Sequence, residues 1–388
     1  MAEARGRVPV NAVDAVAASA PQQPAAPSSA SRLAFADGLR GLAAFWVVLY
    51  HASEGGHLTQ LKAGLPKAIT DLVFNFGHLG VPVFFVLSGF VMAFTVQSET
   101  VDRAFAFRFV LRRLVRLTPP YWVSIALVVG LLAVKGWAVR GTTPLPGAGA
   151  IVANATYLHG ILDVPPLNYV YWTLGVEVQF YIVFALLMLL ADALGPRLGR
   201  LRARTLVFGA TSLVALLWPL GLVADPGWPG GFAPFWFSFV AGVLVCWGWQ
   251  HGGLVAAGAL LLAIAIGIAA LVTDSAFALT AALTATALLA AGRLGRMQTW
   301  LGWGWLQFLG AISYSLYLLH NPLTGAGFNL VRRALPPGIA TELVGLAASV
   351  AICVAVSYAA YRLVEVPSQR WSRAIRLKRP VPLQREFA

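Results

Sequence analysis

Residues 35–51 read FADGLRGLAAFWVVLYH, an apolar stretch with Asp37 and Arg40 near its beginning and His51 at its end. Its length and composition predict a membrane-spanning helix. Arg40 and His51 are eleven positions apart, so at about 100° per residue they return to within roughly 20° of one helical face, about 16 Å apart along it. Ionisable groups in a spanning helix are costly and usually point into a protein interior or a wet cavity. Two interpretations stay open: a functional pair, or an Arg at the inner interface with a His that caps the outer end.

The composition of the whole chain is that of an integral membrane protein. Of its 388 residues, 59% are hydrophobic and only 11% are charged, which excludes an ordinary soluble domain. The net charge of +13 falls in short basic clusters between apolar runs, as membrane topology requires, so we predict no nucleic-acid partner. Cys246 and Cys353 lie in apolar runs without ligand-like spacing, which predicts neither a disulfide nor a metal site.

The apolar runs predict an all-α membrane protein, a polytopic bundle of about ten transmembrane helices, because each span needs roughly 20 mostly apolar residues. The predicted spans are 35–54, 77–97, 118–137, 170–191, 204–223, 232–250, 253–272, 276–292, 304–320 and 340–364. Residues 1–32 are rich in Ala, Pro, Ser and Gln and are expected to form a disordered cytoplasmic tail. Residues 373–388 are expected to form a basic cytoplasmic tail.

The basic residues predict the orientation of this bundle, since Lys and Arg concentrate in cytoplasmic loops. With the N-terminus inside, 21 of the 28 Lys and Arg residues fall in inner segments and six in outer segments, while Arg40 lies within the first span. Both termini are therefore predicted to be cytoplasmic. The long outer loop at residues 136–169 is apolar enough in its middle to form either a lid over an outward-facing site or a surface segment.

The second predicted span contains GHLGVPVFFVLSGFVMAF, with Gly77, Gly80, Ser88 and Gly89. Small residues allow another backbone or a ligand to approach closely. Packing alone explains the pattern, and ligand binding explains it as well.

The approach to the third span reads RFVLRRLVRLTPPYW, in which Arg113 and Arg116 are neighbours on one helical face. Guanidinium forks match phosphate oxygens, so these residues form a candidate site for a nucleotide-bearing cosubstrate that arrives from the cytoplasm. Clustered Arg also serves orientation or contact with anionic headgroups, and that alternative stays open.

The fourth predicted span begins with YWTLGVEVQFYIVF, which places Glu177 inside an apolar run. Glu177 and Tyr181 share a face at i and i+4, and Trp172 and Gln179, seven apart, share another. A lone carboxylate in a membrane must be protonated or paired with a cation or a histidine. The predicted topology puts Glu177 at a depth similar to that of His51, which predicts a His–Glu pair.

Two later stretches carry ionisable groups near helix ends. LQFLGAISYSLYLLHNP ends the ninth predicted span with His320, which is either a capping residue or part of a site. In YRLVEVPSQRW, Glu365 lies between Arg362 and Arg370, and a structural clamp among these charges is predicted.

Six stretches, in this order, resemble the acyltransferase family 3 of membrane proteins: FADGLRGLAAFWVVLYH, GHLGVPVFFVLSGFVMAF, RRLVRLTPPYW, WTLGVEVQFY, SYSLYLLH and LVEVPSQRW. They cover residues 33–372, the predicted transmembrane acyltransferase domain. The resemblance implies an acyl-CoA-dependent O-acyltransferase, since family members take the acyl group from acyl-CoA on the cytoplasmic side. Bacterial members deliver it to cell-surface glycans and, in some cases, macrolide antibiotics.

The resemblance also implies a setting for this chain: a multi-pass protein of a bacterial inner membrane, in contact with the lipid bilayer. It implies acyl-CoA, with acetyl-CoA expected, as cosubstrate and no permanently bound cofactor or metal. The implied acceptor is a hydroxyl of a sugar, a glycan or a glycosylated small molecule. Only about two dozen residues follow the last predicted span, so we expect no appended hydrolase-like domain, and the acceptor stays open.

The resemblance assigns residues to roles. The family's Arg-x10-His pattern falls on Arg40 and His51, its RxxR pattern on Arg113 and Arg116, and its acidic position on Glu177. We expect His51 to be the base that takes the acceptor proton and Glu177 to orient it, with Arg113 and Arg116 on the CoA phosphates. The other residues predicted to bind substrate are Asp37, Arg40, Ser88, Trp172, Gln179, Tyr181 and His320.

Other classes of protein use the same kinds of group. A transporter or flippase of a glycan or lipid-linked substrate would also place ionisable residues in its helices, although no inverted repeat is evident between the two halves. A non-catalytic receptor for a lipid or glycan is the third possibility. Whether an acyl-enzyme forms on His51 is open as well.

Overall fold

The computed structural model describes residues 33–138, 145–224 and 230–377. The predicted disordered tail at 1–32 and most of the predicted basic tail lie outside the described residues. Within those ranges every regular element is a helix, as predicted. Six helical segments are long and apolar enough to cross a membrane: Gly77–Thr95, Arg103–Trp137, Tyr171–Leu198, Gly253–Thr273, Ala276–Arg293 and Ile339–Ala374.

Each predicted span corresponds to a helix. These helices are α1 (Ala34–Glu54), α4 (Gly80–Thr95), α5 (Arg103–Ala138), α7 (Tyr171–Leu198), α8 (Arg200–Ala215), α9 (Trp236–His251), α10 (Gly253–Thr273), α11 (Ala276–Arg293), α12 (Gly304–Val331) and α13 (Ile339–Ala360). Short elements connect them: α2 (Thr59–Ala63), α3 (Lys67–Thr70), η2 (Asp71–Asn75), η3 (Gly77–Leu79), α6 (Ala148–Ala155), η4 (Ala233–Phe235), η5 (Tyr361–Glu365) and α14 (Val366–Ala374). Four of the ten, α1, α8, α9 and α12, are not among the six segments above, and α8 and α9 have only 16 residues each.

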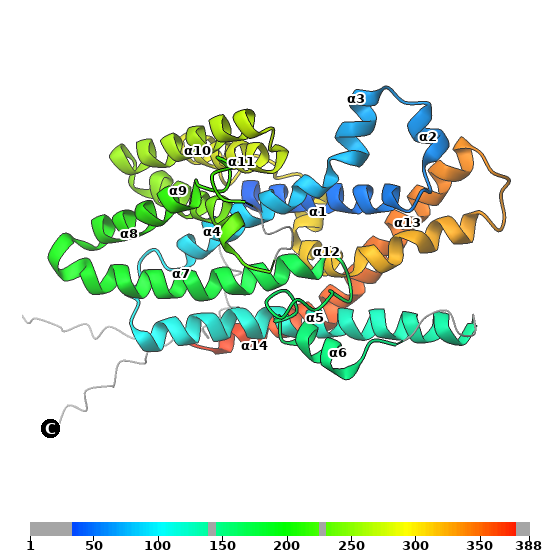
Figure 1. Ribbon diagram of the computed structural model, residues 1–388, viewed down its shortest axis with the longest axis horizontal. Coiled ribbons are helices and arrows are strands. Elements are labelled where there is room, and N and C mark those ends of the chain that lie inside the picture. Colours follow the sequence, from blue (N-terminus) through cyan, green and yellow to red (C-terminus); the bar gives the residue numbers. More distant parts are fainter. Residues whose placement is uncertain (1–32, 139–144, 225–229, 378–388) are drawn as a thin grey trace, which may run out of the picture. The chain divides into compact units, whose positions relative to one another are not determined.

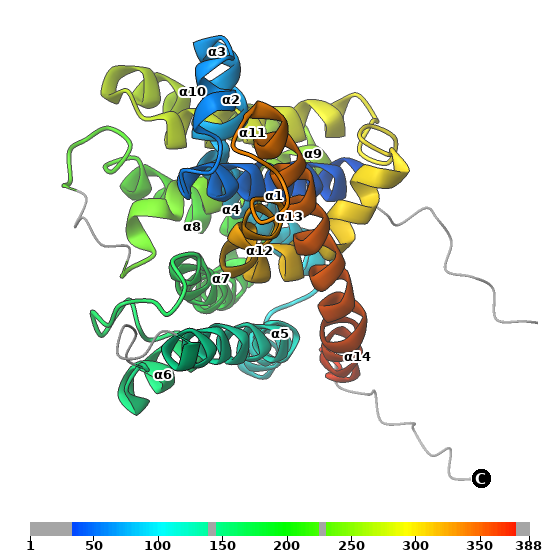
Figure 2. The same ribbon diagram turned by 90° about the vertical axis from the view of Figure 1, so that its right-hand side faces the viewer.

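Helix α1 lies among α4, α12 and α13, and it packs against all three (Figures 1 and 2). Helices α5 and α7 run side by side, and α14 packs against α5 (Figure 2). This arrangement brings the first, second, third, fourth and ninth predicted spans around one interior.

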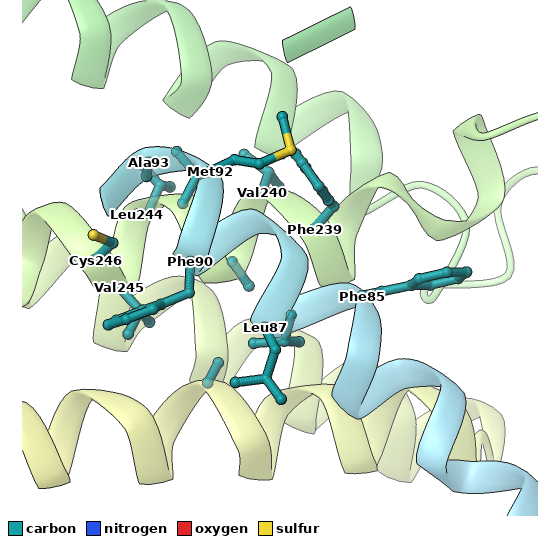
Figure 3. Close-up of a cluster of buried hydrophobic side chains, with 14 of the residues drawn as sticks. Phe85, Leu87, Phe90, Met92, Ala93, Phe239, Val240, Leu244, Val245 and Cys246 are labelled. Carbon is teal, nitrogen blue, oxygen red and sulfur yellow. The ribbon is translucent and has the colours of Figure 1, made fainter. Parts of the chain in front are cut away.

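Helix α4 is apolar except at Ser88 and Thr95, which is typical of a helix enclosed by others. Of its membrane-length segment, 72% is buried, against 33% for α10, so α4 is central and α10 peripheral. Figure 3 shows its side chains interlocking with those of α9. The two backbones cross so closely that a Cβ on Gly89 would lie 2.0 Å from the carbonyl oxygen of Phe239, and one on Gly242 would lie 1.9 Å from that of Val86. Gly89 therefore serves packing.

Helix α5 begins fifteen residues before the predicted span at 118 and continues through Pro119 and Pro120. The prediction was wrong because a proline pair normally marks a helix start: Pro120 has no N–H to bond the carbonyl of Arg116. Here Ser368 of α14 donates to that carbonyl at 2.9 Å. A distant hydroxyl thus keeps the helix intact, as neighbouring side chains do in membrane helices.

Helix α12 also runs on past its predicted end, through Pro322 to Val331. Pro322 leaves the carbonyl of Leu318 without its helical donor. Ser124 of α5 and Asn168 donate to that carbonyl at 3.0 and 3.4 Å. His320 is consequently fully buried inside a helix, and its interpretation as a helix-end cap is wrong.

The clamp predicted around Glu365 does not form. Glu365 is buried and accepts hydrogen bonds from Ser315 at 2.6 Å and Gln369 at 3.0 Å. Arg362 instead lies over the ring of Tyr358, 5.9 Å from its centroid. Glu365 ends the turn of π-helix at η5 and is the buried residue of that turn.

Candidate active site

One cavity lies where α1, α4, α5, α7 and α12 meet, and we call it the arginine cavity. Its volume is about 90 Å³. Its polar lining residues are Arg40, Ser88, Arg113, Arg116, Thr173, Glu177, Tyr181, Ser313, Tyr314 and Tyr317. Five stretches from distant parts of the sequence therefore supply one polar chamber inside an apolar bundle.

The three guanidinium groups of this cavity have few protein partners. Among described residues, Arg113 donates one hydrogen bond, to the hydroxyl of Thr95 at 3.1 Å, and stacks near the ring of Tyr181. Arg116 has a buried Nε without a partner. No described carboxylate forms an ion pair with Arg40, Arg113 or Arg116. Arg40, Arg113 and Arg116 are each partly buried. Like charges gathered in a partly buried site without carboxylate partners favour an anionic ligand here.

Of the residues that the structure describes, Glu177 is the one carboxylate that lines the arginine cavity. Its Oε1 accepts hydrogen bonds from Ser88 at 2.9 Å and from Tyr181 at 2.5 Å. The predicted Glu177–Tyr181 pair at i and i+4 is confirmed. One carboxylate against three guanidinium groups leaves the cavity net positive.

A second cavity, the basic mouth, adjoins the arginine cavity and shares Val91, Arg113 and Arg116 with it. Its volume is about 230 Å³. Its other polar lining residues are Thr95, Arg112, Gln369, Ser372 and Arg373. Among the described residues no carboxylate lines the mouth, and four guanidinium groups from α5 and α14 do. Diphosphate and phosphate groups are the ligands that such a cluster recognises best.

A third cavity, the histidine cavity, adjoins the arginine cavity on another side and shares Val81 and Tyr317 with it. Its volume is about 300 Å³. It is lined mostly by rings, from Tyr50, His51, His78, Tyr169, Trp172, Phe235, Phe277 and Tyr317. The three cavities thus form a series from the unpaired arginines to His51.

His51 of α1 lies beside His320 of α12. The Nδ1 atom of His51 is 3.2 Å from Nε2 of His320 and 3.0 Å from the carbonyl oxygen of Val47. Its Nε2 is buried without a hydrogen-bond partner and lies 3.8 Å from Oε2 of Glu54. His51 lies in the last turn of α1 with its ring against His320 of α12. The functional role predicted for it stays a prediction.

The predicted pair of His51 and Glu177 is not formed. No hydrogen bond or ion pair joins them in the described part of the chain, and each lines a different cavity. The side chains of Val81 and Tyr317 line both cavities and stand between them. The similar depth predicted for the two residues was not enough to predict a contact, because depth does not specify the direction in which each side chain points.

Two other predicted residues lie away from the cavities. Gln179 donates to the carbonyl of Gly230 at 3.1 Å and accepts from the N–H of Phe232 at 3.1 Å, so it holds the segment before η4. Asp37 lines none of the cavities described above, and its backbone carbonyl faces Gly310, where a Cβ would lie 2.2 Å away. Trp172, by contrast, lines the histidine cavity as a binding residue would.

Several residues that sequence reasoning missed line the site. Tyr50, His78, Tyr314 and Tyr317 line one of the two inner cavities. Glu54 follows His51 by three positions on the same helical face, a spacing that predicts contact. Among described residues no three His, Cys, Asp or Glu side chains converge as a metal site.

The helices and the cavities together define a multi-pass membrane protein with an arginine-lined interior cavity next to a cavity lined by His51. The sequence profile of the acyltransferase 3 family, described as an acyltransferase domain, matches residues 33–362. The chain belongs to this acyltransferase family.

Curated relatives are distant. The chain is similar to the acyltransferase MdmB of Streptomyces mycarofaciens, at 27% identity over 342 residues, which cover 79% of this chain and 82% of MdmB. It is 32% identical to the transacylase BcsY of Komagataeibacter xylinus over 48% of this chain and 44% of BcsY. It is 27% identical to the O-acetyltransferase OatA of Staphylococcus aureus over 39% of this chain and 24% of OatA. The chain thus matches less than half of BcsY and about a quarter of OatA. No solved structure matches the chain.

Proposed function

We propose that this protein is an acyl-CoA-dependent O-acyltransferase that moves an acyl group, expected to be acetyl, onto a hydroxyl of a sugar, a glycan or a glycosylated small molecule. The observation that carries the proposal is the series of three cavities, which share lining residues from the unpaired arginines to His51. A donor with an anionic head and a long thin arm matches that series.

The donor fits in an extended form. Its phosphates occupy the basic mouth between Arg112, Arg113, Arg116 and Arg373, where guanidinium forks bind phosphate oxygens in pairs. Its pantetheine arm crosses the arginine cavity, where the Oε2 atom of Glu177 accepts an amide N–H of the arm. The thioester then reaches the boundary between Val81 and Tyr317, next to the histidine cavity.

The transfer takes place in the histidine cavity. His51 takes the proton of the acceptor hydroxyl as that oxygen attacks the thioester carbonyl, a C–O bond forms and the C–S bond breaks. The departing CoA thiolate takes the proton back from His51, which restores the neutral ring. Rings such as Trp172 and Tyr169 supply flat surfaces on which the acceptor stacks.

The predicted topology agrees with this direction of transfer. The basic mouth is built from α5 and α14, whose arginines belong to the segments predicted to be cytoplasmic. The donor therefore enters from the cytoplasm, and the acceptor binds on the outer side of a bacterial inner membrane. Both termini are cytoplasmic in this arrangement.

A label-transfer assay tests the proposal. Purified protein in lipid nanodiscs is incubated with labelled acetyl-CoA and a panel of acceptors: monosaccharides, oligosaccharides and glycosylated small molecules. The affinity for CoA is measured separately by calorimetry. We expect transfer by the wild type, a loss of at least about 100-fold in His51→Ala with unchanged CoA affinity, and lost CoA binding in Arg113→Ala with Arg116→Ala. Absence of any His51-dependent transfer would refute the enzyme, and movement of a glycan across proteoliposomes without acylation would identify a transporter.

The passage between the cavities has its own test. Val81→Trp fills the boundary, so CoA binds as in the wild type but transfer is lost, whereas Val81→Ala retains transfer. Transfer at the wild-type rate by Val81→Trp would show that the thioester does not pass between Val81 and Tyr317.

A further inference from the structure

Two buried histidines from different helices contact each other edge to face. The ring centroids of His51 and His320 are 4.9 Å apart with an interplanar angle of 67°. The contact joins Nδ1 of His51 to Nε2 of His320 at 3.2 Å. Two nitrogens at this distance need one proton between them, so the protonation of one ring depends on that of the other.

The backbone determines where the protons are. Nδ1 of His320 lies 3.0 Å from the carbonyl oxygen of Leu316. A carbonyl oxygen only accepts, so this nitrogen carries a proton, and Nε2 of the neutral ring then carries a lone pair. Nδ1 of His51 faces two acceptors, the carbonyl of Val47 at 3.0 Å and that lone pair, so it carries a proton too.

This assignment leaves Nε2 of His51 as the basic nitrogen. That atom is buried and has no hydrogen-bond partner, which is the state that a base needs before a substrate hydroxyl arrives. Imidazole is a mixture of tautomers when free, whereas this pair of contacts selects one.

The carboxylate of Glu54 is close enough to His51 to form an ion pair with its protonated ring. Oε2 of Glu54 is 3.8 Å from Nε2 of His51, while Oε1 of Glu54 accepts from the hydroxyl of Tyr50 at 2.6 Å. The ion pair exists only when His51 is protonated, so Glu54 favours the imidazolium that forms during proton transfer. From the sequence, Glu177 rather than Glu54 was expected as the carboxylate partner of His51.

We propose that His320 is a positioning residue that holds His51 in the Nδ1-protonated tautomer, and that Glu54 stabilises the imidazolium, so that His51 acts as base through Nε2. The proposal rests on the proposed function, which requires a base at His51. In the reaction the acceptor O–H proton moves to Nε2, the charge is shared with Glu54 and His320, and the leaving thiolate later receives the proton.

Other titratable groups near His51 belong to each neighbouring element. They are Tyr50 and Glu54 of α1, His78 of η3, Tyr169 before α7, and Tyr317 and His320 of α12. Only Glu54 and His320 contact the two nitrogens of His51 among the side chains described. A pH profile that moves in variants of these two residues therefore reports on His51.

The test uses two kinds of substitution at His320. His320→Leu removes the acceptor for the Nδ1 proton, and His320→Gln restores one through its amide oxygen. We expect kcat to fall about 10- to 100-fold in His320→Leu, with both KM values within about threefold, and to recover to within about tenfold in His320→Gln. His251→Leu, at an exposed histidine of α9, is the matched control and should leave kcat unchanged.

Two further readouts separate positioning from mere folding. Glu54→Gln should lower kcat about tenfold and move the acidic limb of the kcat profile to lower pH, because the imidazolium loses its partner. Nitrogen-15 NMR spectra are recorded on histidine-labelled protein in bilayers, and the His51 signals are assigned by their absence in His51→Ala. We expect His51 to show a protonated Nδ1 and an unprotonated Nε2.

The outcomes are distinguishable. A wild-type kcat in His320→Leu, together with an inactive His51→Ala, would overturn this inference and leave the proposed function standing. A protonated Nε2 on resting His51 would overturn it as well. Full activity in His51→Ala would overturn the proposed role of His51 itself, whatever His320 does.

Discussion

Two arginine sites in the same bundle differ in how completely their charges are matched. Arg204 of α8 is buried, and its Nε and Nη2 each donate at 2.8 Å to the carboxylate of Asp192 on α7. The same guanidinium donates to the backbone carbonyls of Val96, Gln97 and Glu99, which follow α4. Arg113, in contrast, has one neutral hydroxyl as its hydrogen-bond partner among described residues.

The difference separates a structural charge from a binding charge. The Arg204 site satisfies every nitrogen with groups of the protein, so it joins α4, α7 and α8 and leaves nothing for a ligand. The arginine cavity holds cations that the fold itself does not neutralise. Such a cluster of like charges is more stable with an anion bound, which is why we propose it as the donor site.

The largest effect, a loss of folding stability, is expected at Arg204, whose hydrogen-bond partners all come from the protein itself. Arg204→Ala leaves the carboxylate of Asp192 buried and unpaired, which should destabilise the fold by about 3–5 kcal/mol. Thermal unfolding in detergent and the yield of folded protein measure this. The double variant Arg204→Met with Asp192→Leu should recover most of the loss, and equal stability of the single variant and the wild type would contradict the distinction.

The next effect is expected on the affinity for CoA rather than on the stability of the fold. Arg113→Ala with Arg116→Ala should weaken CoA binding by roughly 10- to 100-fold per residue, since a hydrogen bond to a charged group is worth about 1.5–3 kcal/mol. The melting temperature without ligand should not fall, because these cations lack protein partners. Arg197→Ala, at an exposed arginine of α7, is the control. A large drop in melting temperature for the pair, with CoA affinity retained, would reverse the assignment.

A smaller effect is expected at the carboxylate of the cavity. Tyr181→Phe removes one of the two hydrogen bonds to Glu177, a loss worth about 1 kcal/mol. The donor KM should rise about fivefold, and Ser88→Ala should act similarly, because either change lets the carboxylate move. Steady-state kinetics with varied acetyl-CoA check this, and a fall in kcat without change in the donor KM would place Glu177 in the chemical step instead.

The smallest effect concerns a buried group without charge. His159, in the segment between α6 and α7, is fully buried beside Gly175, and neither ring nitrogen has a partner. Burial lowers the pKa of His159 below its ordinary value of about 6.5. The unfolded state therefore binds more protons than the folded state below about pH 6.5, so stability falls as pH drops through that value.

His159→Phe should reduce this acid sensitivity. Melting temperatures at pH 7.5 and pH 5 measure it: the decrease on acidification should be smaller in His159→Phe than in the wild type. His251→Phe, at an exposed histidine, should leave the decrease unchanged. If acidification lowered the melting temperature equally in all three proteins, protonation of His159 would not be a cause of the acid sensitivity.

Sequence reasoning located the helices and most of the polar side chains of the site. The apolar runs predicted each major helix, and helical spacing predicted the contact between Glu177 and Tyr181. Spacing also put Arg113 and Arg116 on one face, and both line the arginine cavity. These successes share one cause: they depend on neighbours within a few turns of the same helix, where geometry is regular.

The failures concern the direction in which side chains turn, both along one helix and between helices. The expected partner of His51 was Glu177, but the structure places His320 and Glu54 beside it. The predicted Arg–Glu clamp near Glu365 does not form, and the chain builds such a clamp at Arg204 instead. Rotation of each helix about its own axis decides these contacts, and rotation follows from the packing of all its neighbours.

By itself, then, the sequence of residues 35–51 and its counterparts determined an all-helical membrane protein, because a spanning segment must satisfy its own backbone groups. It left open whether Arg40 and His51 turn toward the interior. Only the tertiary structure decided that α5 and α12 continue through their prolines. Hydroxyl and amide groups of Ser368, Ser124 and Asn168 satisfy the carbonyls that those prolines leave open. Since a buried carbonyl must find a donor from whichever segment lies nearest, such helix ends depend on residues far away in the chain.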